Sequence, residues 1–548
     1  MSLRNRFVLP VLALLSIAML VGCGSSGSSR STPPPSGAFT NSDLSGTYVF
    51  SIAGQDATGG GGFIAIAGTF TADGSGNITG GTITANDPFE GLLSGQPVTN
   101  GTYNVGVDGR PASGNGQLVL NTSVVPFVFD FVLTSSSHGL ITLYDPNNGT
   151  GSGTFDLQAS VTQSNIESQT YAFNFSGVQF ITASGIQNSF ATAGAFALDA
   201  NGAIGVSTTG FQDFNENGLA VCSASTGCQI TAGSVNLASI PGIASLTSSA
   251  GTYSFDVYPV DSTHLKFVET DPAVIMAGDA FSQSASMPTG NNVFSLAGFD
   301  SLAQGPFTAA GIFDLDGSGN VASDSIEDIN DVGLVSEVGS VVSGSATITG
   351  NYTALTNGRS VITLSGFANG TNGGTCSACQ FAAYPSSGGL QLIEIDDGGS
   401  TVGVAYTQTA TALPSAATGY GMNITGNNGV EEDDIAEFTN NNGAFSAGHI
   451  DFNDDGSTNF DLNFSSTYSA DSTVAGRGTV APGTNGLNLT GYVVDNATVV
   501  LVETDTNPIQ VGLGSMVSQG GTVKTNAAAQ HLAALRVKGG VKNSLKRR

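Results

Sequence analysis

The chain has 548 residues, with 42 acidic and 14 basic side chains and a formal net charge of −28. All the acidic residues lie between Asp43 and Asp505, and that body carries only four basic residues, Arg110, Lys266, Arg359 and Arg477. Because binding to phosphate groups depends on clustered Lys and Arg, the composition argues against nucleic acid and anionic membrane surfaces as partners of the body.

The N-terminal 23 residues have the features of a secretory signal peptide. Arg4 and Arg6 precede an apolar run, residues 7–21, that is short for a membrane span. The run ends in Leu20-Val21-Gly22-Cys23, which resembles the lipobox of bacterial lipoproteins. The resemblance implies that Cys23 carries acyl chains such as palmitate and becomes the first residue of the mature chain. An ordinary signal peptide with a chance cysteine is the alternative.

Residues 24–43 form a Gly/Ser/Pro linker, a composition suited to holding a folded body away from a bilayer. No later stretch approaches the roughly 18 uninterrupted apolar residues that a membrane-spanning helix needs. The lipid on Cys23 is therefore the one predicted attachment to the bilayer. We expect an exported protein that is lipid-anchored to the cell envelope, at the outer membrane or the cell surface.

The body consists of four copies of one unit. Each copy opens with alternating large apolar and small residues, the period of a half-buried strand. The openings are TYVFSIAG at 47–54, TYAFNFSG at 170–177, NNVFSLAG at 291–298 and GYGMNITG at 419–426. Each copy closes with a Gly followed five residues later by a Gln, at Gly153/Gln158, Gly278/Gln283, Gly403/Gln408 and Gly514/Gln519. The predicted units are 44–160, 167–285, 289–410 and 416–521, followed by a basic tail at 522–548.

Each unit is predicted to be a small all-β meander. Turns rich in Asp, Asn and Gly, such as 73–77 and 316–320, indicate tight hairpins because these residues tolerate positive φ. About eight short strands fit into each copy, a number that closes into a barrel, with a sandwich as the alternative. The Gly-Thr-Tyr opening followed by hairpins resembles avidin- and lipocalin-type meanders, a likeness of strand pattern that carries no function.

Over residues 44–521 the chain resembles the multi-repeat lipoproteins of unassigned function that are common in acidobacterial genomes. The resemblance rests on the Gly-Thr-Tyr opening, the Asp-Gly-Ser-Gly-Asn turn, the Asp-x-Asn turn, the Glu-Thr-Asp strand end and the closing Gln. It supplies no catalytic residues for this chain.

Four cysteines remain once Cys23 is assigned to the lipid, and they form two close pairs. In an exported chain this predicts local disulfides, here Cys222 with Cys228 and Cys376 with Cys379. A zinc site built from all four is the alternative, although the pairs lie in different repeats and no His accompanies them. A redox CxxC usually begins a helix, whereas Cys376-Ser-Ala-Cys379 lies among Gly, Thr and Asn.

An Asp-x-Asn turn recurs in three copies, with Thr84-Ala-Asn-Asp87 as a degenerate form in the first. Alternating oxygen ligands before a Gly resemble the first half of a calcium loop, but the closing Glu is missing. Asx residues also stabilise turns by bonding to their own backbone, which is the preferred interpretation. The candidate calcium ligands are Asp213, Asn215, Asp328, Asn330, Asp451, Asn453 and Asp455.

Acidic pairs end an apolar strand in copies two to four, at Glu269/Asp271, Glu394/Asp396 and Glu503/Asp505. A carboxylate on an apolar face needs a partner, and a Gly-Arg position recurs in copies one, three and four. We predict structural ion pairs inside two units, Arg359 with Glu394 and Arg477 with Glu503.

Copies one and two do not fit this pairing, because copy one has Arg110 but Leu143 in place of Glu, and copy two offers only Lys266. The same carboxylates also suggest a glycosidase-like acid/base pair. Recurrence in three units and the absence of Trp, the commonest sugar-stacking side chain, argue against that interpretation.

No GxSxG, HExxH or Walker A motif is present, so no catalytic residues are predicted. The sequence favours a non-enzymatic envelope lipoprotein whose β units serve as surface scaffold, spacer or adhesin. Barrels that hold a small ligand or glycan are the alternative, and a secreted hydrolase is a third. Residues 526–538 of the tail suit a short basic helix that contacts anionic lipid or cell-wall polymer, with disorder as the alternative.

Overall fold

The computed structural model describes residues 39–520 with gaps at 57–60, 113–115, 145–148, 182–185, 206–209, 223, 272, 340–346, 369–374, 397–398 and 506–509. The predicted signal peptide, Cys23, most of the linker and the basic tail lie outside the described residues. Helix is limited to a 3-10 turn η1 (Asn41–Asp43) and a short α1 (Gln163–Ile166). In the described part of the chain, no helix has the length and apolar character needed to cross a membrane.

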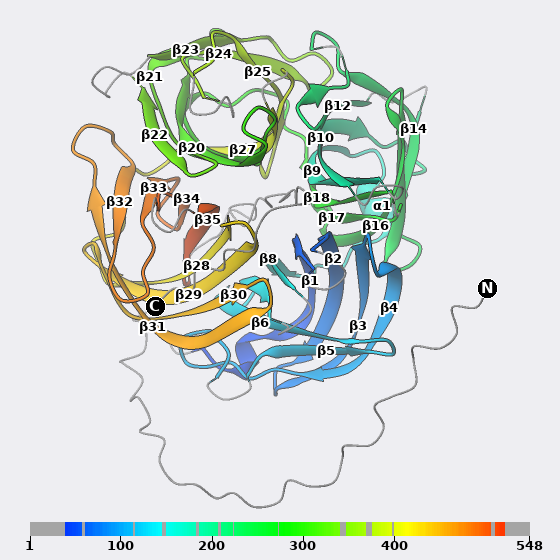
Figure 1. The fold of residues 1–548 in the computed structure, drawn as a ribbon. Helices are drawn as coiled ribbons and strands as arrows, with labels where there is room; N and C mark the ends of the chain where they lie inside the picture. Colours follow the sequence, from blue (N-terminus) through cyan, green and yellow to red (C-terminus); the bar gives the residue numbers. More distant parts are fainter. Residues whose placement is uncertain are drawn as a thin grey trace, which may run out of the picture. The chain divides into compact units, whose positions relative to one another are not determined.

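Each repeat is an eight-stranded antiparallel barrel, and we number the barrels 1 to 4 in chain order (Figure 1). In barrel 1, β1 (Ser45–Gln55) pairs with β2 (Phe63–Asp73) and, on its other side, with β8 (Thr150–Leu157). The last strand thus closes the ring on the first. Tandem all-β barrels were predicted and are confirmed, whereas the sandwich alternative is wrong.

Barrels 1 and 4 are simple meanders in which every strand pairs with its neighbours in sequence. Barrel 1 continues with β3 (Asn77–Asp87), β4 (Gly91–Thr102), β5 (Leu118–Thr122), β6 (Pro126–Ser135) and β7 (His138–Leu143). Barrel 4 contains β28 (Thr418–Asn427), β29 (Glu431–Asn441), β30 (Ala444–Asp454), β31 (Ser457–Ala470), β32 (Arg477–Pro482), β33 (Leu489–Val493), β34 (Thr498–Glu503) and β35 (Val511–Ser518).

Barrels 2 and 3 carry short extra strands, and their rings close through the additional pairings β12–β14 and β20–β21. Barrel 2 contains β9 (Thr170–Ile181), β10 (Ile186–Ala197), β11 (Ala203–Ile204), β12 (Gly210–Glu216), β13 (Leu219–Ala220), β14 (Cys228–Asn236), β15 (Gly242–Ser248), β16 (Gly251–Asp261), β17 (His264–Glu269) and β18 (Val274–Ser282). Barrel 3 contains β19 (Gly290–Asp300), β20 (Gly305–Leu315), β21 (Asn320–Asp331), β22 (Leu334–Gly339), β23 (Ile348–Tyr352), β24 (Ser360–Ser365), β25 (Cys379–Ser386), β26 (Gly389–Glu394) and β27 (Gly399–Thr407).

The closing glycines of the repeat lie where the last strand of a barrel crosses the first. A Cβ on Gly153 would approach the carbonyl oxygen of Ser51 in β1 to 1.8 Å. Gly278, Gly403 and Gly514 meet the equivalent strands at 2.0 to 2.1 Å. Any larger residue would clash with backbone, so the repeated Gly is required for ring closure.

Both faces of the opening strands are buried. In β1, Tyr48, Phe50 and Ile52 point into the core of barrel 1, whereas Val49 and Ala53 belong to a cluster shared with barrel 2. Alternation along a strand places successive side chains on opposite faces. The inward set therefore fills a barrel and the outward set packs against a neighbouring barrel.

The barrels contact one another in a closed cycle. Barrel 1 packs on barrel 2 through residues such as Ala65 and Ile275, and separate apolar clusters join barrel 2 to barrel 3 and barrel 3 to barrel 4. Barrel 4 also contacts barrel 1, where Ile435 meets Val132 and Leu140. Each barrel thus has two neighbours, and the two ends of the array lie against each other.

Candidate functional site

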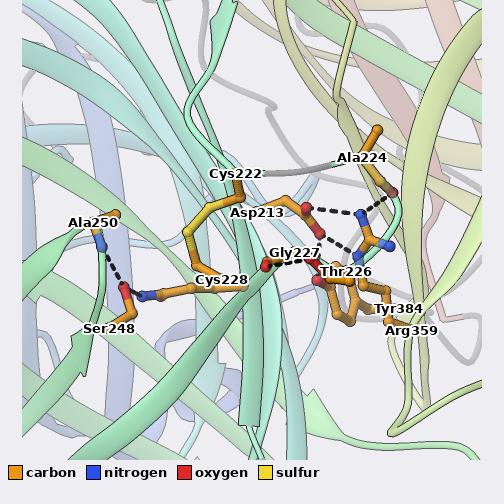
Figure 2. The surroundings of a disulfide bond; sticks show 11 residues. Asp213, Cys222, Ala224, Thr226, Gly227, Cys228, Ser248, Ala250, Arg359 and Tyr384 are labelled. Atoms are coloured by element: carbon orange, nitrogen blue, oxygen red, sulfur yellow. Dashed lines mark hydrogen bonds and ion pairs between the residues drawn. A yellow bond between two sulfur atoms is a disulfide. The ribbon is translucent and has the colours of Figure 1, made fainter.

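Arg359 of barrel 3 forms a buried ion pair with Asp213 of barrel 2. Its Nε and Nη2 atoms lie 2.7 and 2.8 Å from the two carboxylate oxygens, and the Tyr384 hydroxyl donates to the same carboxylate at 2.5 Å. Nη2 also donates to the Ala224 carbonyl at 3.0 Å, as Figure 2 shows. The predicted pairing of Arg359 with Glu394 of its own barrel is therefore wrong.

Arg477 of barrel 4 repeats this arrangement with Asp328 of barrel 3. Nε and Nη2 lie 2.7 and 2.8 Å from the Asp328 oxygens, and the Tyr492 hydroxyl donates to Asp328. Nη1 donates to Asp471 at 2.6 Å. The predicted ion pair between Arg477 and Glu503 is therefore wrong.

Arg110 of barrel 1 completes the series with Asp451 of barrel 4. The two form a salt bridge in which both side chains are buried, and Arg110 Nη1 lies 3.3 Å from Asp461. Burial raises the pKa of the neighbouring Asp130 well above its usual range, and the negative charge of Asp451 adds to the shift. Each of the three arginines therefore neutralises an aspartate of the preceding barrel in the cycle.

Alternation along the strand explains why the predicted glutamate pairs do not form. Glu394 follows Leu392 on the face that points into barrel 3, and Glu503 follows Leu501 on the face that points into barrel 4. Glu394 accepts a hydrogen bond from the Gly399 N–H at 2.8 Å, and burial raises its pKa well above the usual range. The arginines point outward, so each meets the neighbouring barrel.

The Asn of the Asp-x-Asn turn binds the backbone of the next barrel. The Asn215 amide donates to the Glu394 and Gly399 carbonyls at 3.1 and 2.6 Å, while its oxygen accepts from the Gly218 N–H. The contact recurs from Asn330 to Glu503 and Gln510, from Asn453 to Leu143 and Gly149, and from Asn86 to Glu269 and Asp271. This hydrogen bond is present at all four interfaces.

These contacts account for most of the side chains proposed as calcium ligands. Asp213, Asp328 and Asp451 direct their carboxylates at arginines, and the asparagines direct their amides at carbonyls. Asp455 occupies the turn itself, with a φ of +46°. Among the described residues, no group of three or more His, Cys, Asp or Glu side chains is arranged to hold a metal ion.

The closing Gln of the repeat also reaches into the next barrel. Gln158 donates to the Pro259 carbonyl at 2.7 Å and Gln408 to the Val493 carbonyl at 2.9 Å. Gln519 donates to the Leu133 carbonyl at 3.2 Å, which links the last barrel to the first. The sequence identified this residue as a boundary marker, and the structure assigns it to the interfaces.

The interface between barrels 1 and 2 lacks the arginine pair. Thr84 stands where the other copies have Asp, and its hydroxyl donates to Asp256 of barrel 2 at 2.6 Å and lies 2.7 Å from the Tyr258 hydroxyl. Ser94 donates to the same Asp256 oxygen at 2.6 Å. The hydroxyl donors thus come from barrel 1 and the carboxylate from barrel 2, the reverse of the arginine interfaces.

The four remaining cysteines form two disulfides, Cys222–Cys228 and Cys376–Cys379. The first encloses the loop that contains Ala224, whose carbonyl accepts a hydrogen bond from Arg359 (Figure 2). It therefore fixes a segment that takes part in the interface between barrels 2 and 3.

Each barrel encloses a cluster of buried, mostly large apolar side chains. Tyr48, Phe50, Phe70 and Phe129 are fully buried in barrel 1, and their rings pack against one another with centroid distances of 5.4 to 6.1 Å. Barrel 3 encloses a gap of about 10 Å³ lined by Phe294, Leu296, Phe313, Ile362, Leu364, Phe367, Phe381 and Leu392. Small-molecule sites occupy roughly 300–1,000 Å³, so this gap is far too small for a ligand.

Sequence reasoning missed the tyrosines of the interfaces. Tyr258, Tyr384 and Tyr492 each lie three residues after the strand residue that pairs with the inward Glu. This common register could have identified them as a repeated feature. Lys266 was noted only as a candidate partner of Glu269, whereas it points into the interface with barrel 1.

Comparison with protein families and with curated proteins finds no match. Among solved structures, intact Ap-TbpB with its N and C lobes is 10% identical, with 70% of this chain and 84% of that chain covered and a TM-score of 0.18. A transferrin binding protein B double mutant from Haemophilus parasuis Hp5 is 11% identical, with coverages of 74% and 87% and a TM-score of 0.19. The isotype 1 protein from serogroup B Neisseria meningitidis is 11% identical, with coverages of 71% and 86% and a TM-score of 0.19. TM-scores this low support no conclusion about this chain.

Proposed function

We propose that this chain is a non-enzymatic lipoprotein of the cell envelope whose four barrels serve together as a surface scaffold. The observation that carries the proposal is the use of the repeated polar residues. The Asp-x-Asn turns, the Gly-Arg positions and the closing glutamines join one barrel to the next. The groups that a repeated binding or catalytic site would need are thereby engaged in holding the body together.

The pattern of contacts favours a rigid block over an extended spacer. A string of independent barrels would leave the first and last units apart, but Arg110 of barrel 1 pairs with Asp451 of barrel 4. Gln519 at the end of barrel 4 adds a hydrogen bond to Leu133 of barrel 1. Units that share buried contacts with two neighbours unfold cooperatively, which suits a load-bearing part of an envelope.

Attachment through Cys23 is the second part of the proposal, and it places the block at the membrane surface through the Gly/Ser/Pro linker. The body carries few cations, so the lipid rather than the body would supply the affinity for the bilayer. Cell-wall or surface polymers are the partners that such a block would contact.

The proposal is tested with the full chain in a bacterial host that processes lipoproteins, with Cys23→Ser as the matched variant. We expect the native chain to incorporate labelled palmitate and to fractionate with membranes, and the variant to do neither. The purified body of this variant should unfold in a single transition that mono- and disaccharides do not shift. A soluble native chain, four separate transitions, or a saturable rise in Tm with a mono- or disaccharide would contradict the proposal.

A further inference from the structure

Five titratable side chains form a continuous row of contacts across the interface between barrels 1 and 2. In barrel 1, His138 Nδ1 lies 2.7 Å from Asp156 Oδ1. In barrel 2, His264 Nε2 lies 2.7 Å from Asp279 Oδ1. Lys266 connects the two halves, with its Nζ atom 3.5 Å from Asp156 and 3.3 Å from Asp279.

Hydroxyl groups and aromatic rings surround these five side chains. Lys266 also donates to the hydroxyls of Ser51 and Thr154, both in barrel 1. The ring of Phe281 stacks on His264 at a centroid distance of 4.3 Å. Tyr406 from β27 of barrel 3 also interacts electrostatically with Asp279.

Both histidines are well removed from solvent and face the same short list of charged groups. His138 in β7 faces Asp156 from β8, and its side chain is 6% exposed. His264 in β17 faces Asp279 from β18 and interacts electrostatically with Asp156, and its side chain is 4% exposed. Lys266 lies between the two carboxylates with an exposure of 1%. A change of charge on either histidine therefore has a strong electrostatic effect on its neighbours, because little water is present to screen it.

The two aspartates and the lysine keep their charges across the neutral range. Burial raises the pKa of Asp156, but His138 and Lys266 outweigh it and the net shift is downward. Burial likewise raises the pKa of Asp279, and Lys266 with His264 lowers it below its usual range. The pKa of Lys266 is raised, because the two carboxylates outweigh its burial. The two aspartates and the lysine thus carry a net charge of −1 together. Protonation of the histidines determines the net charge of the five side chains.

The geometry points to a pH-sensitive latch between barrels 1 and 2, in which one proton taken up by His138 or His264 brings the net charge of the five side chains to zero and tightens this interface as the pH falls. Histidine is the side chain whose charge changes between about pH 5 and 8. The interfaces between barrels 2 and 3 and between barrels 3 and 4 are bridged by arginine, which stays protonated. At the interface between barrels 4 and 1, His449 lies 2.9 Å from Asp461, which also contacts Arg110, and burial raises the pKa of Asp433 to about 6. Acidification outside the cell, a setting that rests on the proposed function, would then tighten the interface between barrels 1 and 2.

Hydrogen exchange of the full chain at pH 5.5 and 7.5, corrected for intrinsic exchange rates, tests the latch. We expect amides of β8 and β17 to be protected about tenfold more at pH 5.5, because the added positive charge strengthens the contacts across this interface. His138→Gln and His264→Gln should each keep the response, because one histidine remains. The double variant should lose it, and His449→Gln, which alters a histidine beside Asp461 in barrel 4, should not.

Equal protection of β8 and β17 at the two pH values in the native chain would overturn the inference, as would a double variant that keeps the difference. A second measurement needs no variant. Exchange of the histidine ring C–H groups reports the charge of His138 and His264 in the native protein. We expect one proton shared by the pair to bind between pH 5.5 and 7.5, and two histidines that stay neutral, or stay charged, across this range would overturn the latch.

Discussion

The three arginine interfaces and the interface between barrels 1 and 2 join neighbouring barrels through different polar contacts. Three interfaces bury an arginine against an aspartate of the preceding barrel. Between barrels 1 and 2 both members are missing, and a hydroxyl, Thr84, bonds to the carboxylate of Asp256 instead. The Asn amide of the turn donates across all four interfaces.

The two charged residues are absent together for an energetic reason. A buried charge without its partner costs several kcal/mol, whereas replacing both members by neutral groups is often nearly neutral in stability. Barrel 2 lacks the arginine, and barrel 1 has Thr84 where an aspartate would be left unpaired. The mismatch in the repeat is thus a matched substitution across one interface, which no single copy reveals.

The largest expected effect comes from removing one member of an arginine pair. Arg359→Met would leave Asp213, which is 1% exposed, buried without its countercharge, and we expect a loss of about 3–5 kcal/mol in the free energy of unfolding. Denaturant unfolding at pH 7 measures it. Arg359→Met combined with Asp213→Asn should recover most of the loss. A single variant as stable as the native chain would remove the arginine pair as a cause of stability.

Buried glutamates should make stability depend on pH, unlike the arginine pairs. Burial raises the pKa of Glu269 from 4.5 to about 9, so the folded state keeps a proton that the unfolded state releases above pH 4.5. The free energy of unfolding should therefore fall as pH rises from 4.5 to 9, by up to about 1.4 kcal/mol per pH unit. Glu269→Gln should flatten this slope in unfolding measured across the range. Exposed Asp324→Asn is the control, and a slope unchanged by Glu269→Gln would be the contrary result.

Removing the amide shared by all interfaces should have an intermediate effect. Asn330→Ala would leave the carbonyls of Glu503 and Gln510 and the N–H of Gly333 without this partner, at a cost of about 1–3 kcal/mol. Asn320→Ala removes an Asn from an exposed hairpin turn and should cost less than about 1 kcal/mol. Thermal unfolding of the two variants checks the order. Equal losses would mean that the amide stabilises its own turn rather than the interface.

The smallest effect is expected at the hydroxyl–carboxylate contact between barrels 1 and 2. Thr84→Val removes a hydrogen bond to Asp256, but Ser94 still donates to the same carboxylate oxygen at 2.6 Å. We expect a loss of about 1 kcal/mol, clearly below that of Arg359→Met. Denaturant unfolding of both variants under the same conditions provides the comparison. A loss of unfolding free energy for Thr84→Val as large as for Arg359→Met would show that the hydroxyl contact stabilises its interface as strongly as the arginine pair does.

The sequence predicted the elements that repeat and the local chemistry. Alternation at 47–54 and its three counterparts predicted the first strand of each barrel, and Asp-Gly and Asn-Gly turns predicted the hairpins. The pairing of Cys222 with Cys228 followed from spacing and export. These features depend on neighbours within a few residues along the chain.

The partners of the charged residues could not be predicted in this way. Glu394 and Arg359 belong to the same repeat, so sequence reasoning paired them, but they point to opposite sides of the barrel wall. Asp213 lies 146 residues from Arg359, in another copy. A single repeat contains no signal that its outward face meets the next one.

The sequence alone therefore determined the number of units and their strand pattern, because local alternation and turn chemistry fix these. Only the tertiary structure decided what the repeated Asp, Asn, Arg and Gln residues do. Each makes its contact with a different copy, and the contact of Arg110 with Asp451 exists only because barrel 4 meets barrel 1. Such long-range contacts depend on how closed barrels pack, which is set by the outward faces of all four copies together.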